Sequence, residues 1–509
     1  MDTAPRFSAE CFLQKTEKSL LWSAILLLEF HMLHCPYREL INRYDRFTRA
    51  ERWFGLLLLI TVLVYLLITV ILFPKTLYRV RNFLRQFCSF EQCFLIFYFF
   101  WYIITVALRQ HFMGQYHEPG YYFKDNDWWM YMTGLIAFVM FPLARIIGNE
   151  KMKRLIPVML KIIIIPNILF HAWALWQYLH MNPVVFPSGT RLEIYEGVSM
   201  AIGANRNTTG AYSVTMLVLC LYLITTQKSW RKLPYFLGAV IYLMVMILSN
   251  CRTSWYSCLI TFSTAGFLFA WYGFRNRKKA LRLGVGLLLS LFCVLFLHWA
   301  RSAVFQLQDA FFAQIVEHTT SAETAATATN HIASPYLLTV RNLDTSTIHP
   351  SSSVFLASQR TYETGLSQRV PLYRASIYMM THSPYCFLFG VTPSDVGQTL
   401  YGICDVVILE PHAHNFFLQM GMSYGVLTML LTVVFVISLI ARSFRILFCR
   451  GDKLSKGAWM IPVVVLCMLS QDMMEAFLNS GGTMVTVAFY LFAGWILELD
   501  RNYTSDCAN

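Results

Sequence analysis

Pro411-His412-Ala413-His414-Asn415-Phe416-Phe417-Leu418-Gln419 joins a long polar segment to a hydrophobic run long enough to cross a membrane. His412 and His414 stand where this helix is expected to begin, after a proline and beside the capping side chain of Asn415. The dipole at a helix N-terminus disfavours positive charge, so a histidine held there tends to stay neutral and able to accept a proton. The simpler interpretation is a helix start at the membrane surface, with His414 or Asn415 as its cap.

The composition of the chain is that of a polytopic membrane protein. Of its 509 residues, 56% are hydrophobic and only 14% are charged, whereas soluble domains carry about 25% charged residues. Apolar runs of the length that crosses a membrane as a helix recur along the whole chain. They predict about 12 spans, which lie near residues 18–35, 53–73, 91–108, 128–147, 155–179, 209–226, 234–250, 253–273, 283–300, 414–441, 458–478 and 482–498.

Lysine and arginine side chains gather in the loops that follow the second, fourth, sixth, eighth and tenth of these runs. Cytoplasmic loops of membrane proteins carry this excess of positive charge, so both termini are predicted to be cytoplasmic. The net charge of +13 is thereby explained by topology and requires no nucleic acid partner. One loop departs from the rule, because the arginines between residues 38 and 52 would face outwards. Either the run at 18–35, which contains Glu29, does not cross the membrane, or these arginines act at the outer face.

The predicted fold class is an all-α polytopic membrane protein with one long extracytoplasmic loop that carries short helices. Residues 1–300 are assigned to transmembrane helices 1–9, residues 301–413 to the large loop, and residues 414–509 to helices 10–12 and a C-terminal tail. Within the loop, apolar side chains at helical spacing after Pro371 predict a short helix lying near the membrane surface.

Two arginines are predicted to lie at the outer ends of membrane helices. Arg252 falls in Ser249-Asn250-Cys251-Arg252-Thr253-Ser254-Trp255, a very short connection between two apolar runs. Arg206 precedes the run at 209–226, within Asn205-Arg206-Asn207. A charge placed in the membrane is costly unless it is paired or faces a polar cavity, so both arginines are candidates for function. The alternative is that each side chain simply extends to the lipid headgroups.

The order of these features resembles the bacterial O-antigen ligase and O-antigen polymerase superfamily over roughly residues 200–430. The His412–Gln419 stretch, followed by Tyr424-Gly425-Val426, looks like the family's His-x-His-Asn-x-x-Leu-Gln signature. Asn205-Arg206-Asn207 resembles the family's Asn-x-Asn element, and Leu248–Trp255 resembles its Ser-Arg-Gly-type turn, with Cys251 where serine is usual. The family's Arg-x-x-x-aromatic and Pro-x-x-Gly-x-Gly run is matched by Arg369–Tyr373, His382–Pro384 and Phe389–Val391. Thr392 replaces the second glycine of that run.

The resemblance implies a GT-C-like glycosyltransferase of the plasma or inner membrane that uses no cofactor. Its donor would be a glycan on a polyprenyl (undecaprenyl) diphosphate lipid, and its acceptor a sugar hydroxyl of a glycan or glycolipid, met at the extracytoplasmic side of the lipid bilayer. Arg252 and Arg369 match the family's diphosphate-binding arginines, and His414, with His412 beside it, matches the catalytic base. Which of the two histidines acts is left open. Further substrate contacts are assigned to Arg206, Asn207, Asn415 and Arg374.

These residue types suit the implied chemistry. Displacement at the anomeric carbon of a sugar needs a group that takes the proton of the attacking hydroxyl, and a neutral histidine provides one. The departing lipid diphosphate needs positive charge to stabilise it. The planar fork of arginine supplies that charge with two parallel hydrogen bonds, so the prediction is a metal-independent reaction.

Three alternatives accompany this interpretation. Asp125 and Asp127, in Lys124-Asp125-Asn126-Asp127-Trp128-Trp129, could hold a divalent metal with the donor phosphates, or Asp127 could simply cap a helix beside an interfacial tryptophan pair. A ligase that attaches the glycan to a lipid A core or a protein is the alternative to a polymerase, which is preferred because it needs no outer membrane. A lipid-linked glycan flippase is the alternative of another class, disfavoured because transporters usually show internal repeats that this sequence does not display.

Overall fold

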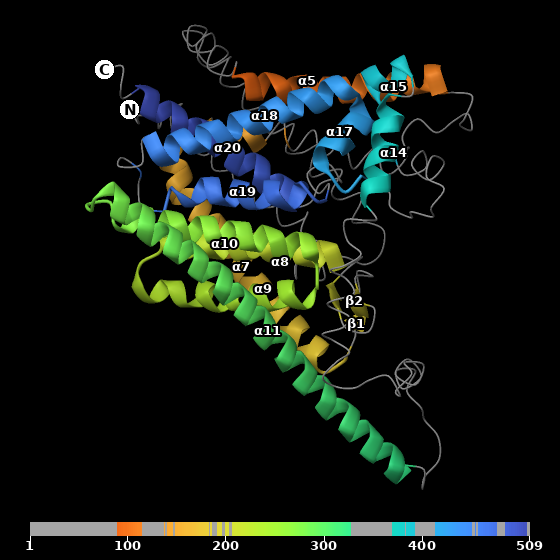
Figure 1. The fold of residues 1–509 in the computed structure, drawn as a ribbon, viewed down its shortest axis with the longest axis vertical. Coiled ribbons are helices and arrows are strands. Elements are labelled where there is room, and N and C mark those ends of the chain that lie inside the picture. Colours follow the sequence, from red (N-terminus) through yellow and green to blue (C-terminus); the bar gives the residue numbers. More distant parts are fainter. Residues whose placement is uncertain are drawn as a thin grey trace, which may run out of the picture.

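In the computed structural model the chain forms a bundle of long helices, with short helices and a small sheet gathered at one end (Figure 1). The structure describes residues 89–113, 137, 140–145, 148–182, 184–185, 191–195, 199–202, 206–326, 369–381, 383–391, 396, 413–449, 454, 457–475 and 484–505. The predicted spans near 18–35 and 53–73 and most of the span near 128–147 lie outside these residues.

The long helices coincide with the predicted apolar runs. They are α5 (Phe90–Met113), α7 (Asn149–Leu179), α8 (Arg206–Thr226), α9 (Leu233–Leu248), α10 (Arg252–Gly273), α11 (Lys279–Ala326), α18 (Val426–Phe444), α19 (Met460–Asp472) and α20 (Met484–Ser505). Within the described residues, five helical stretches are long and apolar enough to cross a membrane: Asn149–Leu179, Arg206–Thr226, Trp230–Leu248, Lys279–Ile315 and Val426–Cys449. The expectation of a mainly helical membrane protein is confirmed at this level.

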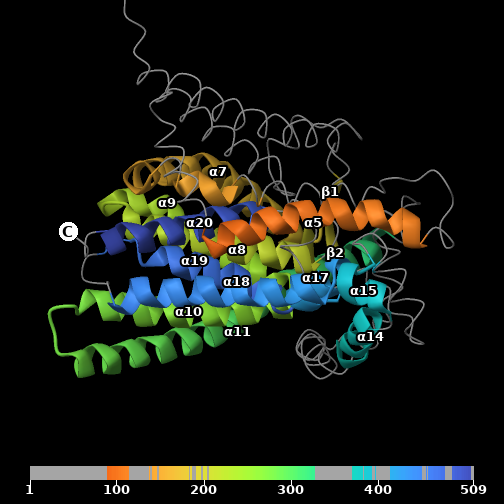
Figure 2. The ribbon, with the colours of Figure 1, turned by 90° about the horizontal axis from the view of Figure 1, so that it is seen from above.

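Helix α8 lies in the middle of the bundle and α11 lies at its edge (Figure 2). The apolar window of α8 is 78% buried, whereas that of α11 is 17% buried. Leu295 and Trp299 of α11 are 60% and 67% exposed, as expected for a helix whose apolar surface faces lipid rather than protein. Helix α11 also continues as helix well beyond its predicted end near residue 300, as far as Ala326. Polar side chains end the apolar run near residue 300, but many of the residues that follow are still good helix formers.

A three-stranded antiparallel sheet between α7 and α8 corrects the prediction of an all-α fold. Its strands are β1 (Val184–Val185), β2 (Arg191–Tyr195) and β3 (Ser199–Ile202), in the order β1-β2-β3. Leu192 pairs with Ile202, and both side chains are buried. In β2 the apolar residues Leu192 and Ile194 alternate with polar ones, which is the period of a strand. The run is too short to stand out against the long apolar helices.

The predicted helix at 414–441 is broken at Gly425 into α17 (Phe416–Tyr424) and α18. Gly425 has a φ of +90°, and a β-carbon on it would lie 2.1 Å from the carbonyl oxygen of Leu388. Gly390, which follows α15 (Pro384–Phe389), has a φ of +69°. A β-carbon on Gly390 would lie 2.4 Å from the carbonyl oxygen of Met422. Only glycine fits both demands, so these two glycines lock α15 onto the junction of α17 and α18.

We expect Gly390→Ala and Gly425→Ala each to lower the free energy of unfolding by about 2–5 kcal/mol, because each adds a side chain to a left-handed backbone and a clash with main chain. Thermal unfolding of the purified protein in detergent checks this. Gly273→Ala is the matched control, since a β-carbon at Gly273 meets nothing within 4 Å. Equal melting temperatures for Gly390→Ala and Gly273→Ala would contradict the interlock.

The predicted loop helix is α14 (Arg369–Thr381), and it packs on α17. Leu372 and Met379 of α14 share a buried cluster with Ala413 and Met422. The helix ends at Thr381, and the Ser383 side chain then caps α15 by accepting the backbone N–H of Cys386. The segment from Ala322 to Ser353, predicted to be loosely packed, lies for the most part outside the described residues.

An ion-pair network ties α5, α18 and α20 together at the other end of the bundle. Arg442 binds the buried carboxylate of Glu91 at 2.6 Å and that of Asp500 at 2.9 Å, and Arg445 binds Asp500 at 3.1 Å. Both arginines belong to the basic clusters that the sequence assigns to the cytoplasmic face. The charges of this cluster therefore contribute to packing as well as to topology.

Candidate active site at the His414 end of the bundle

His414 lies immediately before α17, in a loop that Asn415 fastens. The Asn415 side chain accepts the backbone N–H of Leu418 at 3.1 Å, so Asn415 is the helix cap. Its amide group also donates to the carbonyl oxygen of Met473, just after α19, at 3.1 Å. His414 itself has a φ of +49° and is buried. A left-handed backbone at a residue other than glycine costs about 1–3 kcal/mol and is often found at functional sites.

The imidazole of His414 pairs with Glu475, a residue that sequence analysis did not single out. Its Nδ1 lies 2.7 Å from Oε2 of Glu475, and the two side chains are only 9% and 3% exposed. Glu475 follows the end of α19 at Asp472. The signal that could have found it is a carboxylate inside the apolar run at 458–478, since an acidic group in such a run is by default a functional candidate.

Glu475 also joins the His414 loop to α8 and α10. Its Oε1 accepts from the side-chain amide of Asn207 and from the hydroxyl of Thr253, each at 3.4 Å. Asn207 is the second residue of α8 and Thr253 the second residue of α10. The buried carboxylate of Glu475 thus connects the loop before α17 to the first turns of α8 and α10.

This arrangement assigns different tasks to the two nitrogens of the His414 ring. A carboxylate accepts hydrogen bonds, so the proton of a neutral imidazole is placed on Nδ1, facing Glu475. The lone pair is then on Nε2, which can take a proton from a substrate. Once Nε2 is protonated the ring becomes a cation, and the carboxylate beside it stabilises that cation.

The backbone around His414 is held by further side chains of the same signature. The Gln419 side chain accepts the backbone N–H of Ala413 at 2.9 Å and donates to the hydroxyl of Ser423 at 3.2 Å. The phenol of Tyr373 in α14 reaches the carbonyl oxygen of His414 at 3.5 Å. Asn415 and Gln419 therefore fix the conformation of the loop that presents the histidine.

The turn that carries Arg252 packs directly on the start of α8. Residues 249–251 connect α9 to α10, and Arg252 is the first residue of α10. A β-carbon at Gly210 of α8 would lie 2.6 Å from Cβ of Cys251 and 2.8 Å from Oγ of Ser249. The absence of a side chain at Gly210 thus allows the two elements to touch. Because α8 begins at Arg206, the structure gathers Arg206, Asn207 and Arg252 at the end of the bundle that holds His414.

Cys251 stands where the Ser-Arg-Gly-type turn that this segment resembles usually has a serine, and its thiol is buried. Burial and, after it, the nearby Glu475 carboxylate raise the pKa of this thiol. A thiol with a raised pKa stays protonated near neutral pH and is a poor nucleophile. Cys251 is therefore a packing residue beside the site.

The remaining predicted site residues are described in part. Arg369 begins α14, which the buried cluster with Ala413 holds against α17, and Arg374 is exposed on the same helix. His412, Asp125 and Asp127 lie outside the described residues. In the part of the chain that the structure describes, no group of three or more His, Cys, Asp and Glu side chains is arranged to hold a metal ion.

Comparison with known proteins finds one family for this chain. Residues 237–433 match the sequence profile of a family described as O-antigen ligase. The matched region runs from α9 into α18, so it contains Arg252, Arg369 and His414, whereas Arg206 and Glu475 lie outside it. The search of curated proteins found no match. Residues 237–433 of this chain are therefore similar to an O-antigen ligase domain, and the match supports the resemblance to the O-antigen ligase and polymerase superfamily.

Proposed function

We propose that this protein transfers a glycan from a polyprenyl diphosphate lipid to a sugar hydroxyl of an acceptor glycan, at the outer face of the membrane. The observation that carries the proposal is the buried His414–Glu475 pair, 2.7 Å apart. It lies at the end of the bundle where α8 and α10 begin, and so beside Arg206 and Arg252. A base held by a carboxylate, close to arginines, meets the needs of a displacement that releases a diphosphate.

The reaction is a direct displacement at the anomeric carbon of the donor sugar. The acceptor hydroxyl oxygen forms the new bond to this carbon while its proton passes to Nε2 of His414. The bond from the anomeric carbon to the diphosphate oxygen breaks, and the lipid diphosphate leaves with the electron pair. Glu475 stabilises the imidazolium formed in this step, as a carboxylate does in other histidine-based sites.

Arg252 and Arg369 are proposed to bind the departing diphosphate. Each guanidinium keeps its charge when dehydrated and donates two parallel hydrogen bonds to a phosphate. Arg252 starts α10 and Arg369 starts α14, and Thr253 and Tyr373 link these two helices to the Glu475–His414 pair. Arg206, Asn207 and Arg374 are proposed to contact the substrates. The proposed reaction needs no metal, because the arginines carry the charge that a divalent cation would otherwise supply.

The proposed setting is a cell membrane crossed by about 12 helices, with both termini in the cytoplasm and the site outside. The basic clusters that follow alternate apolar runs support this orientation. The cluster that holds Arg442 and Arg445 lies at the opposite end of α18 from His414, in agreement with it (Figure 1).

A polymerase that joins lipid-linked glycan repeats is the preferred reaction. The second candidate is a ligase that attaches the glycan to a lipid A core or a protein, and the family match is compatible with either reaction. A flippase is the alternative of another class. A buried histidine–carboxylate pair has a task in proton transfer and no evident one in carrying a lipid across the bilayer.

The test uses purified protein in nanodiscs with a polyprenyl-diphosphate-linked glycan, with and without excess EDTA. We expect release of lipid diphosphate and growth of the glycan at an unchanged rate in EDTA, and the product ladder shows whether repeats are joined. Loss of activity in EDTA, restored by a divalent cation, would move the site towards Asp125 and Asp127. Movement of the lipid across the bilayer without any transfer would establish the flippase and overturn the proposal.

A further inference from the structure

Helix α14 carries large apolar side chains on both of its faces. The inner face packs on α17 through a buried cluster that includes Leu372 and Met379. The outer face carries Val370, Ile377 and Tyr378, which are 46% to 52% exposed. A helix that is apolar all round is normally covered on every side, by protein or by lipid.

Helix α15 extends the same kind of surface towards the membrane-crossing helices. It packs on α14, and its side chains Phe387 and Leu388 are exposed. It also packs on α18, where Leu427 and Leu430 of the first turns are exposed as well. Because α18 is long and apolar enough to cross a membrane, its exposed side chains are expected to face lipid. The exposed surface of α15 therefore adjoins a surface in contact with the bilayer.

The position of α15 along α5 gives a first estimate of its depth. The ring of Phe389, the last residue of α15, stacks on Trp101 of α5 with the ring centres 5.3 Å apart. Trp101 lies about 15 Å along the helix from Glu91, which belongs to the ion-pair network at the cytoplasmic end. Helix α5 then continues to Met113, about 18 Å further on, and both Figure 1 and Figure 2 show it extending beyond α15.

Helix α18 gives a second estimate of the same depth. The carbonyl oxygen of Leu388 lies against Gly425, at the start of α18. Gly425 is about 25 Å from Arg442 of the ion-pair network, at 1.5 Å per residue. Both estimates are smaller than the thickness of roughly 30 Å of a bilayer's hydrocarbon core. Helix α15 thus lies at the depth of the outer leaflet and not above it.

The orientation of α14 suits the plane of the membrane. Figure 1 shows α14 lying across the direction of α5 and α18. Its exposed residues Val370, Arg374, Ile377 and Tyr378 are spaced by four, three and one positions, so they form one face of the helix. A helix in the interfacial plane keeps an apolar face towards the acyl chains, and the long side chain of Arg374 can carry its charge out to the headgroups.

We propose that the outer faces of α14 and α15 form one surface that contacts the acyl chains of the outer leaflet. The sequence predicts only that α14 lies near the membrane surface, whereas this surface embeds both helices in lipid. Both helices also pack on α17, which follows His414 closely in the chain. The His414–Glu475 pair then lies behind a wall that faces lipid. The surface consists of Val370, Ile377, Tyr378, Phe387 and Leu388.

The experiment places the photoreactive residue p-benzoylphenylalanine at Ile377 or at Phe387, in the protein reconstituted in phosphatidylcholine nanodiscs. Illumination joins the benzophenone to a neighbouring C–H group, and mass spectrometry of the intact protein detects a gain of one phospholipid. Leu295 of α11 is the positive reference, because its side chain is exposed on a membrane-crossing helix.

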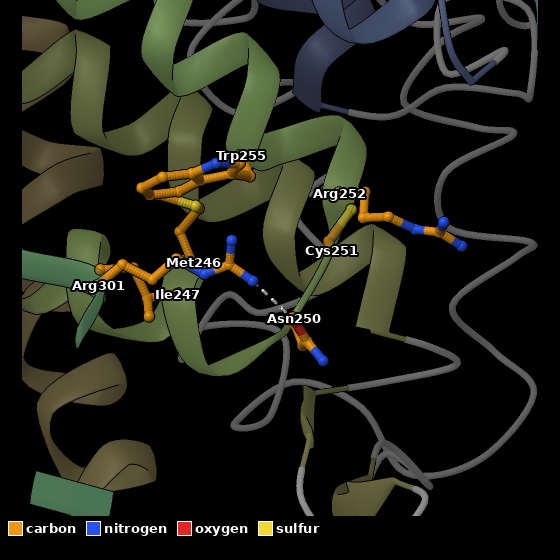
Figure 3. Close-up of a pocket in the computed structure, with 7 residues that line it drawn as sticks. All are labelled: Met246, Ile247, Asn250, Cys251, Arg252, Trp255 and Arg301. Atoms are coloured by element: carbon orange, nitrogen blue, oxygen red, sulfur yellow. Dashed lines mark hydrogen bonds between the residues drawn. The ribbon is translucent and has the colours of Figure 1, made fainter. Parts of the chain in front are cut away.

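Two further positions serve as negative controls. Trp255 lies at the outer end of α10 but is buried, with the Arg301 guanidinium over its ring (Figure 3). Arg277 is exposed between α10 and α11, in a loop predicted to be cytoplasmic. A buried side chain and a hydrated one both lack acyl-chain neighbours, so each should give at least about tenfold less lipid adduct than Leu295.

We expect lipid adducts at Ile377 and Phe387 with a yield within about threefold of that at Leu295, because equivalent lipid-facing surfaces meet the same acyl chains. Fragmentation of each adduct should place the new bond on an acyl chain. Where a melting temperature shows that a variant has not folded, Tyr378 and Leu388 provide the neighbouring exposed positions on the same two helices.

The proposal is overturned by the lack of lipid adducts at either helix while Leu295 gives them, or by bonds to the headgroup alone. Adducts that join two protein chains would assign the surface to a contact between copies and would also overturn it. Because the readout is independent of catalysis, the lipid-facing surface stands or falls separately from the proposed glycan transfer.

Discussion

Replacing His414 by alanine is expected to slow glycan transfer by about 10²–10⁴-fold, the range for loss of a positioned general base. The effect should appear in kcat, because the proton passes to the imidazole in the step that breaks the bond to the diphosphate. The measurement is the rate of release of lipid diphosphate in nanodiscs at saturating donor. The buried ring binds no metal in the proposed reaction, so addition of divalent cations should not restore the rate.

The control is His180→Ala, because His180 caps the C-terminus of α7, is exposed and hydrogen-bonds through its ring to the carbonyl oxygen of Trp176. This variant should transfer glycan at the wild-type rate. A His414→Ala protein that keeps its melting temperature and works within about threefold of wild type would reject His414 as the base. The same assay on His412→Ala separates the two histidines of the signature, and we expect the smaller effect at His412.

Replacing Glu475 by glutamine is the second large effect, with an expected loss of about 10²-fold or more in kcat. The substitution keeps the shape of the side chain and an oxygen for Asn207 and Thr253, but it removes the charge that stabilises the protonated His414. The dissociation constant for the donor should stay close to that of wild type, since the carboxylate acts through His414. Glu475→Asp, which restores the charge on a shorter side chain, should recover part of the rate.

A merely structural role for Glu475 would give a different pattern. The matched control is Glu91→Gln, which removes another buried carboxylate at the opposite end of the bundle. It should lower the melting temperature, because Arg442 loses a partner, and leave kcat unchanged in the protein that stays folded. If Glu475→Gln behaved in the same way as Glu91→Gln, or if Glu475→Asp recovered nothing, the pairing would be structural.

Much of the bundle could be predicted from the sequence because its signals are local. Apolar runs of membrane-crossing length mark the helices from α7 to α20, and Asn415 caps α17 as its position before Phe416 suggests. The short turn before Arg252 and the helix after Pro371 are local features of the same kind. Each depends on a stretch of fewer than about 20 residues and on no partner elsewhere in the chain.

The features that were missed depend on contacts between distant residues. Glu475 lies 61 positions after His414, and no local pattern indicates that their side chains meet. The break at Gly425 exists because the Leu388 carbonyl oxygen takes the space of a side chain there. Tyr424 and Gly425 lie inside one apolar run, and neither residue type indicates such a contact, so the sequence predicted a continuous helix.

The separation of His414 from Glu475 has a consequence for biogenesis. During synthesis the histidine leaves the ribosome well before its carboxylate, and α18 and α19 must be inserted between the two events. Until α19 is in place, Asn207 and Thr253 also lack the oxygen that binds them. A chain whose insertion stalls after α17 therefore holds Arg252 and Arg369, the arginines proposed to bind the donor, but lacks the carboxylate that pairs with His414. Under the proposed function, the order of assembly thus keeps an unfinished protein from consuming lipid-linked sugar.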